Sequence, residues 1–285
     1  MSTISVELDA PTASAPRRTR APGALATLAR RRARLTARNP RQVAVPLITP
    51  ILFVLVIAPA LQDALGGLAT GIDYMSYVSV GAVGLLLPFT AIFAGLSVIV
   101  DRDSGAQREL LAAPVRRGLL LAGNLVVVAG LAALQVAALI GFAVVAGAHF
   151  HVTVAGAAWF LAAALGFTLF MAAVAETLAG RIGKQEEYVA TTPAIAVVPW
   201  FFAGALFPIG ALPAALTDIA KFLPLTHALA LLRYGLSDPH GSGLHDIWGM
   251  SNTTAEAWLS LAVVAAFAAA FAVLAVRSFT RSAVR

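Results

Sequence analysis

The chain has 285 residues, a formal net charge of +6, no cysteine, and a composition that is 59% hydrophobic and only 12% charged. With a mean hydropathy of +0.84, this composition excludes an ordinary soluble domain and indicates a polytopic membrane protein. The absence of cysteine excludes disulfides, thiol catalysis and thiolate metal sites. The basic excess is better explained by membrane topology than by binding to nucleic acid.

The first residues divide into a tail and an amphipathic segment. Residues 1–21 are rich in Ser, Thr, Ala and Pro and are predicted to form a disordered cytoplasmic tail. Residues 22–41 carry a cluster of arginines, with Leu25, Leu28 and Leu35 on the other side. This pattern is typical of a helix that lies on an anionic membrane surface, so membrane lipid is its expected partner.

Long apolar runs predict an all-α protein with six transmembrane helices. Residues 118–175 carry no charge and are too many for one crossing, so we expect a hairpin at His149 and His151. Prolines in the first run should bend or unwind its helix. The predicted spans are residues 43–61, 75–100, 119–148, 154–178, 188–207 and 257–276.

The distribution of basic residues predicts the orientation of these spans. If the N-terminus is cytoplasmic, Lys221 and Arg233 are the only basic residues on the outer side. The positive-inside rule favours this arrangement. We therefore expect a multi-pass protein of the bacterial inner membrane, with both termini, including residues 281–285, in the cytoplasm.

A charged island at residues 101–118 separates the second and third spans. Ser104 can cap a helix there, and Ala106, Leu110 and Ala113 fall on one helical face. These features predict a short amphipathic helix held at the cytoplasmic membrane surface. An ordinary solvated loop remains the alternative.

The segment between the fifth and sixth spans predicts two short outer helices. In the first helix, Pro213 suits the first turn, and an apolar stripe recurs at helical spacing. The second helix is expected at about residues 226–234, with both helices dipping into the outer leaflet or lying on it. The stripe consists of Leu212, Leu216, Ile219 and Leu223.

Ionisable and polar residues limit the classes of function. The predicted spans lack ionisable groups at mid-depth, whereas an ion-coupled transporter normally carries them there. Glu176 lies near a cytoplasmic end and is expected to pair with Arg181. Asn124 and Gln135 either line a pathway or bond neighbouring helices.

Two classes of function have weak support in the sequence: a membrane-embedded enzyme and an ATP-independent transporter. A membrane-embedded enzyme would need a site, but the histidines match no metal or catalytic motif and are expected to be exposed loop residues. Gly183-Lys184-Gln185 lacks the spacing and the Ser/Thr of a phosphate-binding loop, so no ATP site is expected. An ATP-independent transporter is the second alternative. The histidines are His149, His151, His227, His240 and His245.

The chain resembles the permease subunits of ABC-2 type exporters, the class that includes daunorubicin-type drug efflux and export of lipids and polysaccharides. The resemblance covers roughly residues 22–280. One part is the island, with its glycine, acid-leucine-leucine and proline-valine-basic pattern. The other is the outer segment before the last span. Two departures are Ala106, where the family often has threonine, and the aspartates that stand in place of glutamates before the glycine.

The resemblance implies that the island is a coupling helix that docks on a separate ATP-binding subunit, which would hold the ATP and Mg. This chain would then need no cofactor of its own, and a second permease copy or a sibling permease would complete the transporter. The implied coupling residues are Gly105, Arg108, Glu109, Leu110, Leu111, Pro114 and Arg116. The implied outer-gate residues are Pro208, Leu212, Pro213, Pro224, Thr226 and Arg233.

Overall fold

The computed structural model describes residues 21–65, 73–106, 109–110 and 117–282, and these residues form helices and connecting loops without a strand. The elements are α1 (Ala21–Ala37), α2 (Pro40–Leu52), the π-helix η1 (Phe53–Ile57), α3 (Ala58–Leu65), α4 (Tyr74–Asp103), α6 (Arg117–Val145), α7 (Val154–Ala179), α8 (Gln185–Ala190), the π-helix η2 (Pro193–Val197), α9 (Val198–Phe202), the 3-10 helix η3 (Ile209–Ala211), α10 (Ala214–Phe222), α11 (Pro224–Leu236), α12 (Ser242–Trp248) and α13 (Thr253–Ser282).

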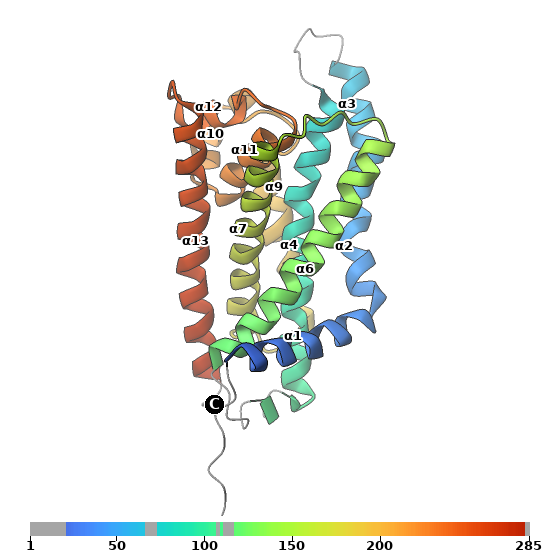
Figure 1. The fold of residues 1–285 in the computed structure, drawn as a ribbon, viewed down its shortest axis with the longest axis vertical. Coiled ribbons are helices and arrows are strands. Elements are labelled where there is room, and N and C mark those ends of the chain that lie inside the picture. Colours follow the sequence, from blue (N-terminus) through green and yellow to red (C-terminus); the bar gives the residue numbers. More distant parts are fainter. Residues whose placement is uncertain (1–20, 66–72, 107–108, 111–116, 283–285) are drawn as a thin grey trace, which may run out of the picture.

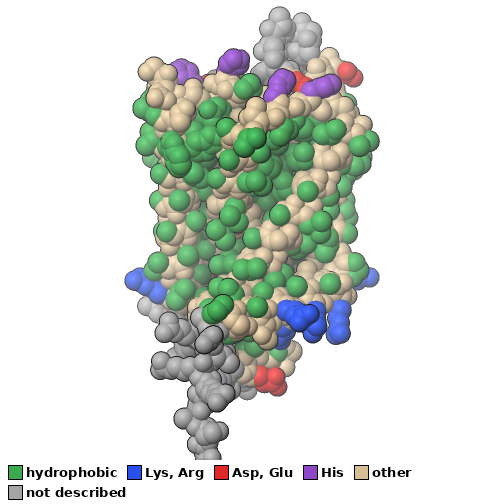
Figure 2. Space-filling view, in the orientation of Figure 1, with side chains coloured by type: hydrophobic (Ala, Val, Ile, Leu, Met, Phe, Trp, Pro, Cys, Tyr) green, Lys and Arg blue, Asp and Glu red, His purple; other side chains and the backbone are tan. Residues whose placement is uncertain are grey.

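The long helices run side by side, while α1 lies across one end of the bundle and α10, α11 and α12 gather at the other (Figure 1). We call these the α1 end and the α12 end. On the face shown in Figure 2, an apolar band separates Lys and Arg side chains at the α1 end from His side chains at the α12 end. Such a band with polar ends suits a bilayer.

Among the described residues, five helices are long and apolar enough to cross a membrane, and the bent pair α10–α11 is a sixth candidate. The five are residues Pro40–Ala64, which join α2, η1 and α3, together with α4, α6, α7 and α13. The all-helical, polytopic class predicted from the sequence is confirmed. The last four of these helices coincide with the predicted second, third, fourth and sixth spans within a few residues.

The predicted fifth span, residues 188–207, is not one helix. It is divided into α8, η2 and α9, which ends at Phe202. Pro193 and Pro199 supply no backbone N–H, so a regular α-helical ladder cannot pass through them. The chain instead widens to a π-turn, in which the Val198 N–H donates to the Pro193 carbonyl.

The first span uses the same device. Its π-turn η1 lies between Pro50 and Pro59, and the Ala58 N–H donates to the Phe53 carbonyl. The two irregular segments also meet, since the rings of Phe53 and Trp200 lie 4.7 Å apart in an edge-to-face arrangement. The expected distortion by proline is therefore present, and it falls where two imperfect helices pack together.

Helices α4 and α7 form the inside of the bundle. In their most apolar windows, 61% and 50% of residues are buried, compared with 17% for α13. Small residues allow the close contacts. A Cβ placed on Gly235 of α11 would lie 2.6 Å from the Gly156 carbonyl oxygen of α7. The outer faces of α6 and α13 carry exposed apolar side chains such as Leu134 and Trp258, as lipid contact requires.

Helix α11 at the α12 end is buried more deeply than the sequence predicted. Helix α11 is longer than expected and almost wholly buried, because it is apolar on nearly every face. It packs on α7 and α13 and forms an angle of 84° with α10. The predicted apolar stripe of α10 is only partly inward, since Ile219 is 54% exposed and Ala220 is the buried residue.

Helix α1 matches the predicted surface helix but ends at Ala37 rather than residue 41. Asn39 precedes Pro40, and a residue before proline is disfavoured in the α conformation. Asn39 adopts φ −121° and ψ 81°, and Pro40 then begins α2. The surface helix and the first crossing are therefore separate elements joined at a sharp corner.

Candidate functional site

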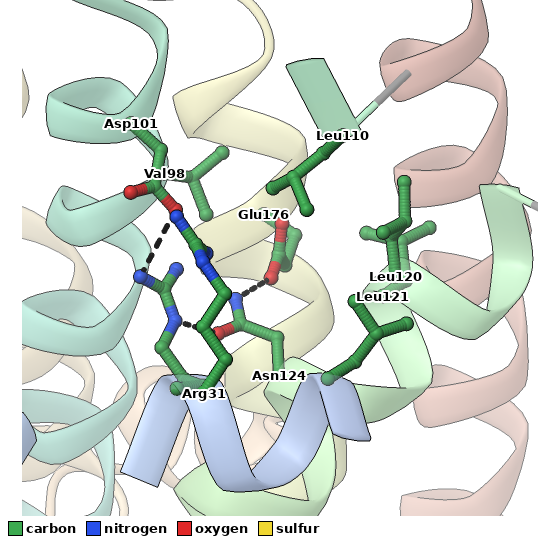
Figure 3. Close-up of a pocket in the computed structure, with 10 residues that line it drawn as sticks. Arg31, Val98, Asp101, Leu110, Leu120, Leu121, Asn124 and Glu176 are labelled. Atoms are coloured by element: carbon green, nitrogen blue, oxygen red, sulfur yellow. Dashed lines mark hydrogen bonds and ion pairs between the residues drawn. The ribbon is translucent and has the colours of Figure 1, made fainter. Parts of the chain in front are cut away.

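Charged and polar side chains from four helices meet at the α1 end. We call this group the inner cluster. It brings α1 against the last turn of α4 and against the α1-end halves of α6 and α7 (Figure 3). Its members are Arg31, Arg32, Asp101, Asn124 and Glu176.

The inner cluster is a continuous chain of interactions. Arg32 Nη1 lies 3.2 Å from Asp101 Oδ2, and Arg31 Nη1 lies 3.7 Å from the same oxygen. Arg32 Nε donates to Asn124 Oδ1, while Asn124 Nδ2 donates to Glu176 Oε1. In Figure 3 the Asn124 amide points directly at the Glu176 carboxylate. One side chain of α1 thus connects to three transmembrane helices.

The charges in this cluster balance. Burial lowers the pKa of Arg32, and the neighbouring Asp101 carboxylate opposes that shift. Both arginines lie at ion-pair distance from Asp101, whereas Glu176 is connected to Arg32 only through the Asn124 amide. Buried pairs of this kind are costly to break because the remaining partner keeps its desolvation penalty.

The cavity at the centre of the cluster is small. Its volume is about 60 Å³, and the apolar part of its lining consists of Leu28, Val98, Leu110, Leu120 and Leu121. Ligand pockets are typically about 300 Å³ or larger, so this space suits a few water molecules at most. The inner cluster is therefore a joint between helices rather than a substrate site.

Arg102 forms a second link at the end of α4. Its guanidinium donates to the carbonyl of Ala179 at the end of α7 (3.1 Å) and to those of Ile182 (3.1 Å) and Gly183 (2.9 Å) in the connection between α7 and α8. Gln185 Nε2 also reaches Asp103 Oδ2 at 3.4 Å. The charged island and the loop after the fourth span, which are distant in sequence, are therefore held together by one arginine.

The structure describes only part of the predicted coupling segment. Gly105 has φ +78°, a conformation that favours glycine, and follows the end of α4. Ser104 follows the last residue of α4, and its hydroxyl donates back to the Asp101 carbonyl; the predicted capping contact with residue 107 lies outside the described residues. Glu109 is exposed, whereas Leu110 lines the cavity of the inner cluster. Arg108, Leu111, Pro114 and Arg116 lie outside the described residues.

Other polar residues of the bundle bond neighbouring helices. Thr90 donates to Gln135 Oε1 at 2.6 Å, and Gln135 Nε2 donates to the Val43 carbonyl at 2.7 Å. These bonds join α4, α6 and α2. The expected pairing of Glu176 with Arg181 is wrong within the described part of the chain, because Asn124 takes that role.

The predicted outer-gate residues lie at the α12 end in different settings. Arg233 is 5% exposed, stacks on the Tyr77 ring at 3.5 Å and donates to the Ala205 carbonyl at 2.9 Å. Thr226 is buried beside it in α11. The remaining residues mark helix ends: Pro208 and Leu212 flank η3, Pro213 precedes α10, and Pro224 begins α11.

Sequence reasoning missed Tyr77 and misplaced one histidine. Tyr77 gives no signal in an apolar run, and only its contact with Arg233 reveals a role. His227 is buried rather than exposed, with Nε2 2.9 Å from the Lys221 carbonyl and Nδ1 3.2 Å from Ser260 Oγ. Within the described ranges, no three His, Cys, Asp or Glu side chains are arranged to hold a metal.

Comparison with protein families now adds to this geometry. The family model for the ABC-2 type transporter matches residues 23–237, which include nearly all of α1, the inner cluster and the whole of α11. No curated protein sequence matches the chain. The family match covers most of the chain. It agrees with the resemblance to ABC-2 permeases seen in the sequence and with the helical bundle of the structure. The chain belongs to the ABC-2 type transporter family.

Proposed function

We propose that this chain exports a hydrophobic or amphipathic substrate from a bacterial cell, using ATP hydrolysed by a separate nucleotide-binding subunit. Family membership makes the chain a multi-pass permease component of an ABC transporter. The proposal adds the direction, the substrate class (drug, lipid or glycan), the inner-membrane location with cytoplasmic termini, and ATP and Mg bound only by the partner.

The arrangement at the end of α4 is the observation that carries this proposal. Helix α4 ends at Asp103, inside the predicted coupling segment at residues 101–118, and Asp101 and Arg102 in its last turn make polar links to other elements. Asp101 connects α4 to α1, and Arg102 connects it to the α7–α8 connection. A force applied to the coupling segment therefore reaches several helices through two adjacent side chains.

This connectivity suits rigid-body transmission. Packed helices shift as units rather than deform continuously, so a small displacement of residues 105–110 would move the end of α4. Arg32 and Arg102 would carry that displacement to the surface helix and to α7. The exposed Glu109 is positioned for polar contact with an ATPase. Leu110 instead supports the segment from the membrane side.

The polar residues of the bundle support an amphipathic cargo. Gln135 and Thr90 are already bonded to each other and to a neighbouring helix, so they offer no ion-binding site. The exposed apolar faces of α6 and α13 allow contact with lipid or with a second permease, either an identical copy or a sibling. We expect the working transporter to contain two such membrane domains.

The test is ATPase coupling in a reconstituted complex. Replacing Glu109, Leu110 and Leu111 together by alanine should abolish permease-dependent stimulation of the ATPase while membrane insertion is retained. Arg34→Gln is a suitable control, because Arg34 is an exposed residue of α1. Unchanged ATPase stimulation and transport in the triple variant would reject the coupling role, and transport by the purified chain without any ATPase would reject the proposed function.

A further inference from the structure

A second and much larger cavity lies at the α12 end. Its volume is about 560 Å³, within the range of small-molecule sites. It is a partly open cavity lined within a single chain by the loop before α10, the connection between α6 and α7, and helices α4, α11 and α12. The apolar part of its lining includes Ala203, Ile209 and Ala230, all buried. Unlike the inner cluster, this space is large enough for an organic ligand.

Two buried polar atoms in the lining lack a hydrogen-bond partner. Within the described part of the chain, neither Thr226 Oγ1 nor Arg233 Nε is paired, although these residues are 3% and 5% exposed. Buried groups of this kind normally find a partner, because leaving one unpaired costs about 1–3 kcal/mol. Both residues line the cavity, so an oxygen atom of a ligand or a water molecule would satisfy them.

The charges around the cavity are mainly acidic. Three carboxylates, those of Asp73, Asp238 and Asp246, line it together with one guanidinium, that of Arg233, and the lining also holds His149, His151 and His240. Asp73 accepts hydrogen bonds from the start of α4, and Asp238 accepts them from the start of α12. The Arg233 guanidinium stacks on the Tyr77 ring and donates from Nη2 to the Ala205 carbonyl, while its Nε has no partner among the described residues. The charge balance therefore favours a positively charged guest.

Asp246 is the carboxylate best placed to meet that guest. It lies in α12 and is only partly buried, and it makes no hydrogen bond or ion pair with a described residue. Burial raises the pKa of this carboxyl, and a cation beside it would oppose the shift. A cavity with apolar side chains next to an unpaired carboxylate suits an amphipathic cation, whose apolar part contacts the side chains while its charge faces the carboxylate.

We propose that the cavity at the α12 end binds amphipathic organic cations, with the apolar body against Ile209 and Ala230 and the cationic group beside Asp246. This site lies at the opposite end of the molecule from the inner cluster. Its binding does not require the proposed ATP coupling, although an export substrate with this chemistry would deepen that function. The two proposals can therefore fail separately.

The absence of cysteine makes the test direct. We would label a His240→Cys variant, whose side chain lies at the exposed edge of the cavity, with an environment-sensitive fluorophore in lipid nanodiscs without ATPase. Three probes share one alkyl chain below micelle-forming concentrations: octyltrimethylammonium, octyl glucoside and octyl sulfate. We expect saturable binding that is strongest for octyltrimethylammonium.

Charge variants identify the recognising residue. Asp246→Asn should weaken octyltrimethylammonium binding about fivefold, as expected for a partly exposed ion pair. It should leave octyl glucoside unchanged, and Asp246→Glu should retain the affinity. Asp218→Asn is the matched control, because Asp218 is exposed on α10 and does not line the cavity.

The proposal is overturned if the three probes bind equally or not at all, or if the two asparagine variants behave alike. Should Asp246→Asn fail to fold, the comparison of the probes in the parent protein still decides. None of these outcomes depends on ATP. A failure here therefore leaves the ATPase-stimulation test of the proposed function untouched.

Discussion

Each end of the molecule holds an arginine with little exposure to solvent, but the two are stabilised differently. Arg32 at the α1 end has Asp101 as an ion-pair partner and reaches Glu176 through Asn124. Arg233 at the α12 end has no carboxylate at ion-pair distance among the described residues, and is held by an aromatic ring and backbone carbonyls. The first arrangement joins a surface helix to the bundle, while the second joins α11 to α4 and to Ala205 inside it.

This difference agrees with the placement of the arginines along the chain. Arg32 belongs to a surface helix that contacts the bundle on one side, so its side chain links separate elements. Arg233 belongs to α11, which is buried between α7 and α13. We infer that the α1 end transmits movement and that the α12 end resists it. The following predictions test that contrast, beginning with the largest effect.

The close contact of α7 with α11 should be the most sensitive part of the α12 end. Gly235→Ala would place a Cβ 2.6 Å from the Gly156 carbonyl oxygen and 2.8 Å from the Phe160 backbone nitrogen. Because backbone cannot move aside as a side chain can, we expect a loss of about 3 kcal/mol in stability. Thermal unfolding in detergent measures it. Gly141→Ala, which meets nothing within 4 Å, should leave the melting temperature unchanged or raise it.

Removing the bridge of the inner cluster should have the next largest effect. Asn124→Leu takes away the bonds to Arg32 and Glu176, leaving both without this buried partner. We expect a loss of about 2 kcal/mol, together with weaker coupling to the ATPase. Val126→Ala, at an exposed position of the same helix, is the control. Equal melting temperatures for the two variants would show that Asn124 does not bridge the helices.

The aromatic support of Arg233 should make a smaller contribution. Tyr77→Leu removes the ring beneath the guanidinium, and we expect it to cost about 1.5 kcal/mol, as for a largely desolvated cation–π contact. Tyr77→Phe keeps the ring and loses only the bond from the hydroxyl to the Gly204 carbonyl, so about 1 kcal/mol is expected. A phenylalanine variant as unstable as the leucine variant would assign the stabilisation to the hydroxyl instead.

The sequence was sufficient to predict the regular crossings. Hydropathy and charge gave α4, α6, α7 and α13 because each is one uninterrupted apolar helix. The segment from α8 to α9 was harder, since Pro193 and Pro199 interrupt the hydrogen-bond ladder in a run that is apolar throughout. Helix α11 was expected near the surface, although its apolar character on nearly every face was a sign of burial.

Long-range pairs were the least predictable feature of the candidate sites. Arg102 bonds three carbonyls at the end of α7 and in the loop after it, and carbonyls carry no sequence signal. The interpretation of Asn124 as a residue that bonds neighbouring helices was among those considered from the sequence, but its partners Arg32 and Glu176 were not identifiable. The role of the coupling segment as an ATPase contact stays a prediction.

The central claim, that the end of α4 transmits ATPase movement into the bundle, is tested most directly by transport per ATP hydrolysed in the reconstituted complex. With Arg102→Gln, we predict that the partner still binds and hydrolyses ATP while transport falls at least about tenfold, a change equivalent to about 1.4 kcal/mol of coupling. Arg34→Gln should behave as the parent. An unchanged ratio of transport to hydrolysis in the Arg102→Gln complex would contradict the account.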